Sequence, residues 1–259
     1  MLTKRLTKFN KLRKSDGTYY SMYQLANHQN NIAQNGFTIL NDIYTGDEIN
    51  AILNTISKTD QSNPTFRKTN DLFAIRQFLK EMPEVKQLVF NDRLKQCINQ
   101  LSGAGYFIVK SIYFDKPPQS NWFVAWHQDL TISVDGKANI PGYNSWTNKL
   151  NQFAVQPPVN ILRDNFTVRI HLEDTNEDNG ALKVIPGSHL DIIRAESLNL
   201  QPGDGVSCNV PAGGIMIMRP LLMHASNRTT NDKQRRVVHI EFSKAELPAE
   251  IDWAEKQEI

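Results

Sequence analysis

The chain has 259 residues and a formal net charge of +2, with 40% hydrophobic and 22% charged residues. This balance is typical of a globular protein, and the charge is too small to indicate a nucleic-acid partner. The two cysteines allow at most one disulfide, and no apolar run approaches the roughly 20 residues of a membrane span. We therefore expect a cytoplasmic protein with no membrane span; the sequence does not indicate its oligomeric state.

The first half of the chain predicts helices. Residues 1–30 form a basic extension, and residues 31–259 are expected to form a single domain. Thr45 and Glu48 have the spacing of a capping box, and apolar residues follow at helical period. Leu72 and its apolar neighbours predict a further helix over 71–82.

Another helix is expected to begin at Pro83, to break near Asn91 and to end at Gly103. From Tyr106 onward the texture changes to β-branched and aromatic runs separated by Gly/Pro turns. Strands are predicted at 106–114, 166–172, 181–185, 215–218 and 236–242. Short strands of this kind favour a sandwich or a barrel, in a mainly β fold with flanking helices.

Residues 135–160 have no clear period and contain Pro141, Gly142, Pro157 and Pro158 beside aromatic residues. A loop this long inside a compact domain is usually functional or disordered, and a disordered linker seldom carries aromatic side chains. We interpret this stretch as an irregular loop that covers a site.

The segment Trp126-His127-Gln128-Asp129 carries the strongest chemical signal. In a strand, residues i and i+2 point to the same face, so His127 and Asp129 aim an imidazole and a carboxylate at one point. His224, after the apolar run 215–218, can supply a second imidazole. Two histidines and one carboxylate leave adjacent coordination positions open, which is typical of non-haem Fe(II) sites.

Several segments, in order, resemble the phytanoyl-CoA dioxygenase family of Fe(II)/2-oxoglutarate oxygenases. The segments are Asn35-Gly36-Phe37 near the start, Trp126-His127-Gln128-Asp129, Asn179-Gly180-Ala181-Leu182 with Pro186-Gly187-Ser188-His189, and His224-Ala225-Ser226 with Arg235. The resemblance covers residues 31–243 and implies a double-stranded β-helix, a cupin-like jelly roll. It also implies Fe(II), 2-oxoglutarate and O2 as reactants and a small-molecule substrate.

The resemblance implies that His127, Asp129 and His224 hold the iron and that a buried cation binds the far carboxylate of 2-oxoglutarate. Arg235 shares a strand face with His239 and Glu241, whereas Arg236 shares one with apolar residues. Because an enzyme barrel has a polar interior, the alternation favours Arg235 over Arg236 as that cation. Ser226 can add a hydroxyl donor.

The presence of Asp129 implies hydroxylation of a C–H bond, since halogenating relatives have a small residue there. Two alternatives stay open: a cupin-like metalloenzyme that does not use 2-oxoglutarate, and a non-catalytic binding protein that keeps the fold. The candidates for substrate contact are Arg169, His171, Gln156 and Trp146. Trp122 is expected to pack in the core, and Lys110 is either a cavity charge or a solvated one.

Overall fold

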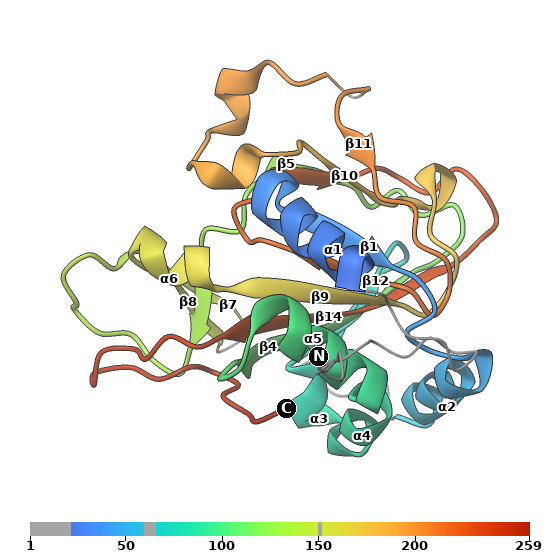
Figure 1. The fold of residues 1–259 in the computed structure, drawn as a ribbon, viewed down its shortest axis with the longest axis horizontal. Helices are drawn as coiled ribbons and strands as arrows, with labels where there is room; N and C mark the ends of the chain where they lie inside the picture. Colours follow the sequence, from blue (N-terminus) through green and yellow to red (C-terminus); the bar gives the residue numbers. More distant parts are fainter. Residues whose placement is uncertain (1–21, 60–65, 150–151, 202) are drawn as a thin grey trace, which may run out of the picture.

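The computed structural model describes residues 22–59, 66–149, 152–201 and 203–259 (Figure 1). Most of the basic extension expected over residues 1–30 lies outside these ranges. The first described helix, α1 (Met22–Asn35), contains the expected boundary at residue 30, and its Ile32 is buried in the main core. Among the described helices, none is long and apolar enough to cross a membrane.

The β part consists of antiparallel sheets. The largest has the order β1-β12-β9-β14-β4-β3-β2, the second has the order β11-β10-β13-β5, and the third has the order β6-β8-β7. The strands are β1 (Phe37–Leu40), β2 (Phe66–Lys68), β3 (Phe73–Arg76), β4 (Phe107–Lys116), β5 (Val124–His127), β6 (Ile132–Val134), β7 (Asn144–Lys149), β8 (Gln152–Gln156), β9 (Phe166–His171), β10 (Leu182–Val184), β11 (Val206–Ser207), β12 (Ile215–Met218), β13 (His224–Ser226) and β14 (Arg235–Ser243).

The two larger sheets are held together by apolar side chains. Leu182 and Val184 of β10 share a buried cluster with Met216 and Met218 of β12. Figure 1 shows β5, β10 and β11 on one side of the large sheet and α3, α4 and α5 on the other. This arrangement confirms the predicted jelly roll with flanking helices.

The helices pack on the outer face of the large sheet. They are α2 (Gly46–Ser57), α3 (Phe78–Glu81), α4 (Lys86–Val89) and α5 (Asp92–Ser102), with α6 (Val159–Asp164) beside the third sheet and short 3-10 turns at Pro83–Val85, Glu177–Asn179, Ser188–Leu190 and Ala195–Leu198. The Thr45–Glu48 capping box is confirmed, with the Thr45 N–H donating to Glu48 Oε2 at 2.7 Å. The break near Asn91 and the end at Gly103 are confirmed as well.

The predicted helix over 71–82 was wrong in its first half. Residues Phe73–Arg76 form β3, which pairs with β4, and only Phe78–Glu81 is helical. Gln77 joins the two elements with a φ of 51°. The pairing with β4 is a long-range interaction, and it overrides the local apolar spacing.

The predicted irregular loop over 135–160 was also wrong in part. Residues Asn144–Lys149 and Gln152–Gln156 form the antiparallel pair β7–β8, and β8 pairs with β6. The β7 sequence, NSWTNK, is polar, so it has little strand signal of its own. Its pairing with β8 and the burial of Val155 define the strand.

Gly213 fixes the approach of the segment before α2 to the large sheet. Its carbonyl accepts from the N–H groups of Ile43 and Tyr44 at 3.0 and 2.9 Å. Its φ is +81°, and an added Cβ would clash with the Tyr44 carbonyl oxygen. We expect Gly213→Ala to lower the free energy of unfolding by about 2 kcal/mol, because both strain and clash act there. Urea titration measures this change. Gly103→Ala is the control: Gly103 has a φ of +92° but open space around it, so the free energy of unfolding should fall by less.

Candidate metal centre

The pairing of β5 with β13 places two histidines opposite each other. His127 and His224 are direct partners across these strands, and their ring centroids lie 4.2 Å apart. Asp129 lies just beyond the end of β5, where its N–H donates to the Pro220 carbonyl at 2.9 Å. The structure therefore brings the predicted ligands together. The prediction that His127 and Asp129 share a strand was wrong for Asp129, because β5 ends at His127.

Gln128 points away from this group, as the strand period predicted. It is buried, and its Nε2 donates to carbonyls of Ser188, Asp191 and Leu221 at 3.2, 2.8 and 2.6 Å. Its Oε1 accepts from the N–H of Ile193 at 2.8 Å. These bonds tie β5 to the segment that follows β10, and they fix the strand end that carries both His127 and Asp129.

The geometry of the three side chains fits a metal ion. Nδ1 of His127 lies 2.8 Å from the Ala125 carbonyl, and Nδ1 of His224 lies 2.8 Å from the Leu222 carbonyl. Each carbonyl accepts the Nδ1 proton, so both Nε2 lone pairs are free for a metal. The Nε2 atoms lie 3.7 and 3.8 Å from the Asp129 oxygens, too far for hydrogen bonds. One ligand atom from each residue fits within a 4.8 Å group.

The protonation states also suit metal binding. Burial lowers the pKa of His224 to about 4, so its imidazole is neutral near pH 7. Burial alone would raise the pKa of Asp129, but His224, Lys110 and His127 outweigh it and hold that pKa below its ordinary value. Two imidazoles and one carboxylate are the donor set of a 2-His-1-carboxylate iron site.

A cavity of about 220 Å³ lies over these side chains. Its lining comprises Lys110, Ile112, Phe114, Trp122, Val124, His127, Asp129, Arg169, Leu182, His224, Ser226, Arg235, His239 and Glu241. We call it the triad cavity. The sequence predicted Trp122 as a packing residue. It stacks on Phe114, with ring centroids 6.0 Å apart, and it also lines the cavity.

Arg235 is one of two buried guanidinium groups that line the triad cavity, beside Arg169, and no described acid pairs with it. It is 2% exposed, and its Nε and Nη1 have no hydrogen-bond partner among the described residues. Burial and the neighbouring Arg169 lower its pKa to about 9, which leaves it charged near pH 7. A buried guanidinium without a partner is costly, so this position favours an anionic ligand.

Arg236 and Ser226 have partners already. Arg236 lies on the other face of β14, where its Nε donates to Glu173 at 3.0 Å. The hydroxyl of Ser226 donates to the Gly180 carbonyl at 2.9 Å, so it can donate to a ligand only after rotating. The alternation along β14 thus places Arg235 on the cavity side, together with His239 and Glu241.

Polar side chains form a chain of contacts along the cavity wall. Nη1 of Arg169 lies 3.1 Å from Nδ1 of His239, and Nε2 of His239 lies 3.1 Å from Glu241 Oε1. Lys110 Nζ donates to the same Glu241 oxygen at 2.6 Å. Lys110 is therefore a cavity residue. The alternation along β14 predicted that His239 and Glu241 share a face with Arg235. Their contacts with Lys110 on β4 and Arg169 on β9 could not be predicted, because they depend on strand pairing.

Of the four residues predicted to contact the substrate, the structure places one in the triad cavity. Arg169 lines the triad cavity, whereas the other three candidates lie outside its lining. His171 is buried behind it, with Nδ1 2.8 Å from Thr175 Oγ1. Trp146 packs against the core of the third sheet, and the Gln156 side chain accepts from Ser145 at 3.4 Å.

Glu255 lies beside the cavity wall, in the C-terminal segment. Its oxygens accept from Ser111 N and Oγ at 3.1 and 2.5 Å. Burial raises its pKa from 4.5 to about 7. As the pH rises, the unfolded chain loses this proton at a lower pH than the folded protein does. The free energy of unfolding therefore falls as the pH rises from about 4.5 to about 7, and it stays lower above that range.

We expect the free energy of unfolding of Glu255→Gln, relative to that of the unsubstituted protein, to be higher at pH 8 than at pH 4 by roughly 2–3 kcal/mol. Urea unfolding of the metal-free protein at both pH values measures this. A pH-independent difference between the two proteins would contradict it. Glu246→Gln, at an exposed position, is the matched control.

The comparisons with known proteins agree with the site. The family model for phytanoyl-CoA dioxygenase (PhyH) matches residues 32–237. The chain therefore belongs to the phytanoyl-CoA dioxygenase family, as its motifs predicted. No curated protein sequence matches it significantly.

Solved structures share the fold at low sequence identity. SnoK, a non-haem alpha-ketoglutarate-dependent carbocyclase from nogalamycin biosynthesis, has a TM-score of 0.64 and 16% identity over 94% of this chain and 89% of its own. The epimerase SnoN, in complex with Fe3+, alpha-ketoglutarate and nogalamycin RO, gives 0.64 and 13% over 92% and 96%. EctD from S. alaskensis with bound Fe gives 0.62 and 20% over 86% and 76%. Structures of this fold thus hold iron and 2-oxoglutarate, with different reaction outcomes.

Proposed function

We propose that the chain is an Fe(II)- and 2-oxoglutarate-dependent dioxygenase that hydroxylates a C–H bond of a small-molecule substrate. The observation that carries this proposal is the presence, in one cavity, of the His127–Asp129–His224 group and the unpaired Arg235. A metal enzyme that did not use 2-oxoglutarate would have no evident need for a buried guanidinium without a counter-ion. We assign residues 31–259 to this one catalytic unit.

His127, Asp129 and His224 would hold Fe(II) through two Nε2 atoms and a carboxylate oxygen. Iron bound there would support oxidation of the substrate C–H by O2, with 2-oxoglutarate converted to succinate and CO2 and the second oxygen atom entering the product. The carbonyls of Ala125 and Leu222 keep both imidazoles in the ligating tautomer.

Arg235 would bind the far carboxylate of 2-oxoglutarate with Nε and Nη1, the two atoms that lack partners. Ser226 would contribute its hydroxyl after turning away from Gly180. Arg169 is held against His239 and keeps this end of the cavity positive. The anionic co-substrate would thereby supply the negative charge that the two buried guanidinium groups lack.

The proposal is tested by incubating the protein with Fe(II), 2-oxoglutarate and O2, and by measuring succinate. We expect slow, iron-dependent succinate formation without substrate, and faster formation when a metabolite extract contains the substrate. The product should then be heavier by one oxygen atom, taken from labelled O2. Iron binding without succinate would favour the alternative that does not use 2-oxoglutarate, and absence of iron binding would favour a non-catalytic relative.

A further inference from the structure

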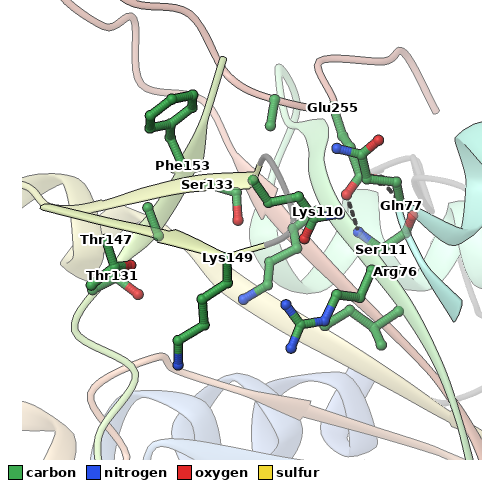
Figure 2. A pocket seen from close by; sticks show the side chains of 14 residues that line it. Arg76, Gln77, Lys110, Ser111, Thr131, Ser133, Thr147, Lys149, Phe153 and Glu255 are labelled. Atoms are coloured by element: carbon green, nitrogen blue, oxygen red, sulfur yellow. Dashed lines mark hydrogen bonds between the residues drawn. The ribbon is translucent and has the colours of Figure 1, made fainter. Parts of the chain in front are cut away.

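A second cavity, of about 240 Å³, adjoins the triad cavity. Lys110 and Ile112 of β4 line both cavities. The other walls come from the end of β3, the β6-β8-β7 sheet and the C-terminal segment (Figure 2). The two cavities therefore meet at Lys110 and Ile112, and His127 and Asp129 line the far side of this boundary.

Basic side chains reach into this second cavity from three strands. Figure 2 shows Arg76 of β3, Lys110 of β4 and Lys149 of β7 extending into the same space. Lys110 is balanced by Glu241 at 2.6 Å. Within the described ranges, the side chains of Arg76 and Lys149 form no ion pair or hydrogen bond. Two basic groups thus face the cavity without a counter-ion, and we call it the basic cavity.

Glu255, the acid in the basic cavity, neutralises this charge only in part. Glu255 directs both carboxylate oxygens at Ser111, as the dashed lines in Figure 2 show. Burial raises its pKa to about 7, so a part of it is uncharged near neutral pH. Burial and the nearby Arg67 both lower the pKa of Arg76, and none of the described acids forms an ion pair with Arg76.

The rest of the lining mixes polar side chains with the apolar Ile112, Phe153, Ala154 and Ala254. Thr131 and Ser133 of the β6 region, Thr147 of β7 and Gln152 of β8 offer hydroxyl and amide groups. These polar groups can form hydrogen bonds with a polar molecule seated beside them. The volume also limits the occupant to a small molecule or to the head of one.

We propose that the basic cavity binds the oxyanion group, carboxylate or phosphate, of a small polar substrate, through Arg76 and Lys149. The remainder of the substrate passes Lys110 and presents its C–H bond to the metal centre. This inference rests on the proposed function for its catalytic meaning. Arg76 supplies the planar donor pair that suits an oxyanion, and Lys149, on the strand pair β7–β8, closes the site from the other side.

The test is an anaerobic calorimetric titration of the protein loaded with Fe(II) and saturating 2-oxoglutarate, so that Arg235 is occupied. Inorganic phosphate and acetate are titrated separately at constant ionic strength, and the tighter of the two identifies the oxyanion. Arg76→Gln and Lys149→Gln should each weaken binding roughly tenfold, because each removes a charged hydrogen bond. Lys80→Gln, an exposed lysine of α3 outside both cavities, should bind as the unsubstituted protein does.

Binding of neither anion, or equal binding by all variants, would overturn the inference. The same titration on metal-free Arg235→Gln protein requires neither iron nor the 2-oxoglutarate anchor. A protein that fails to use 2-oxoglutarate but binds the anion there, with loss in Arg76→Gln, would contradict the proposed function and leave the basic cavity standing as an anion site. A protein that uses 2-oxoglutarate but binds neither anion would contradict the inference about the basic cavity and leave the proposed function standing.

Discussion

Replacing Arg235 with alanine is expected to raise the 2-oxoglutarate concentration for half-maximal succinate formation by roughly 100-fold, which corresponds to about 3 kcal/mol. The reason is that Arg235 is the buried cation of the triad cavity whose donors have no partner among the described residues. Iron affinity should be unchanged, because Arg235 is not one of the ligands. Iron binding and succinate formation, measured on the same preparation, separate the two effects.

Arg236→Ala is the matched control, since it removes the neighbouring arginine from the opposite face of β14. Its guanidinium is paired with Glu173 and does not line the triad cavity. We expect its 2-oxoglutarate requirement to stay within about twofold of the unsubstituted protein, as for a partly exposed ion pair. Equal effects of the two substitutions would argue against Arg235 as the anchor.

Replacing Asp129 with alanine is expected to lower succinate formation by at least roughly 1000-fold. The carboxylate is the charged member of the proposed ligand group, and its loss leaves only two imidazoles. Iron titration of the variant should show weakened binding, while circular dichroism should show the fold retained. Asp191→Ala, which removes an exposed carboxylate, should leave both quantities unchanged. Full turnover by Asp129→Ala would contradict the assignment of the metal ligands.

The triad residues could be predicted because their signal is local. The alternation along β14 follows from strand geometry alone. The i, i+2 spacing pointed to His127 and Asp129 as a pair, although β5 ends at His127 and the bond of the Asp129 N–H to Pro220 holds the residue beyond the strand. Family motifs in order then supplied His224. What the sequence could not give is the register that sets His224 opposite His127, because strand pairing is a long-range property.

The errors have the same physical origin. Leu72, Ile75 and Leu79 have a spacing that suits a helix, yet Ile75 belongs to β3 because β4 offers it a partner strand. The polar segment of β7 has no period of its own, and it forms a strand because β8 pairs with it. The basic cavity was not predictable for this reason, since Arg76, Lys110 and Lys149 come from three separate strands.

The most direct test of the central claim is the visible absorption spectrum after Fe(II) and then 2-oxoglutarate are added to the protein without oxygen. Chelation of iron by the 2-oxo acid should give a weak metal-to-ligand charge-transfer band, without any substrate. We expect this band in the unsubstituted protein, its loss in Asp129→Ala, and a much higher 2-oxoglutarate requirement in Arg235→Ala. Iron binding with no band at saturating 2-oxoglutarate would contradict it.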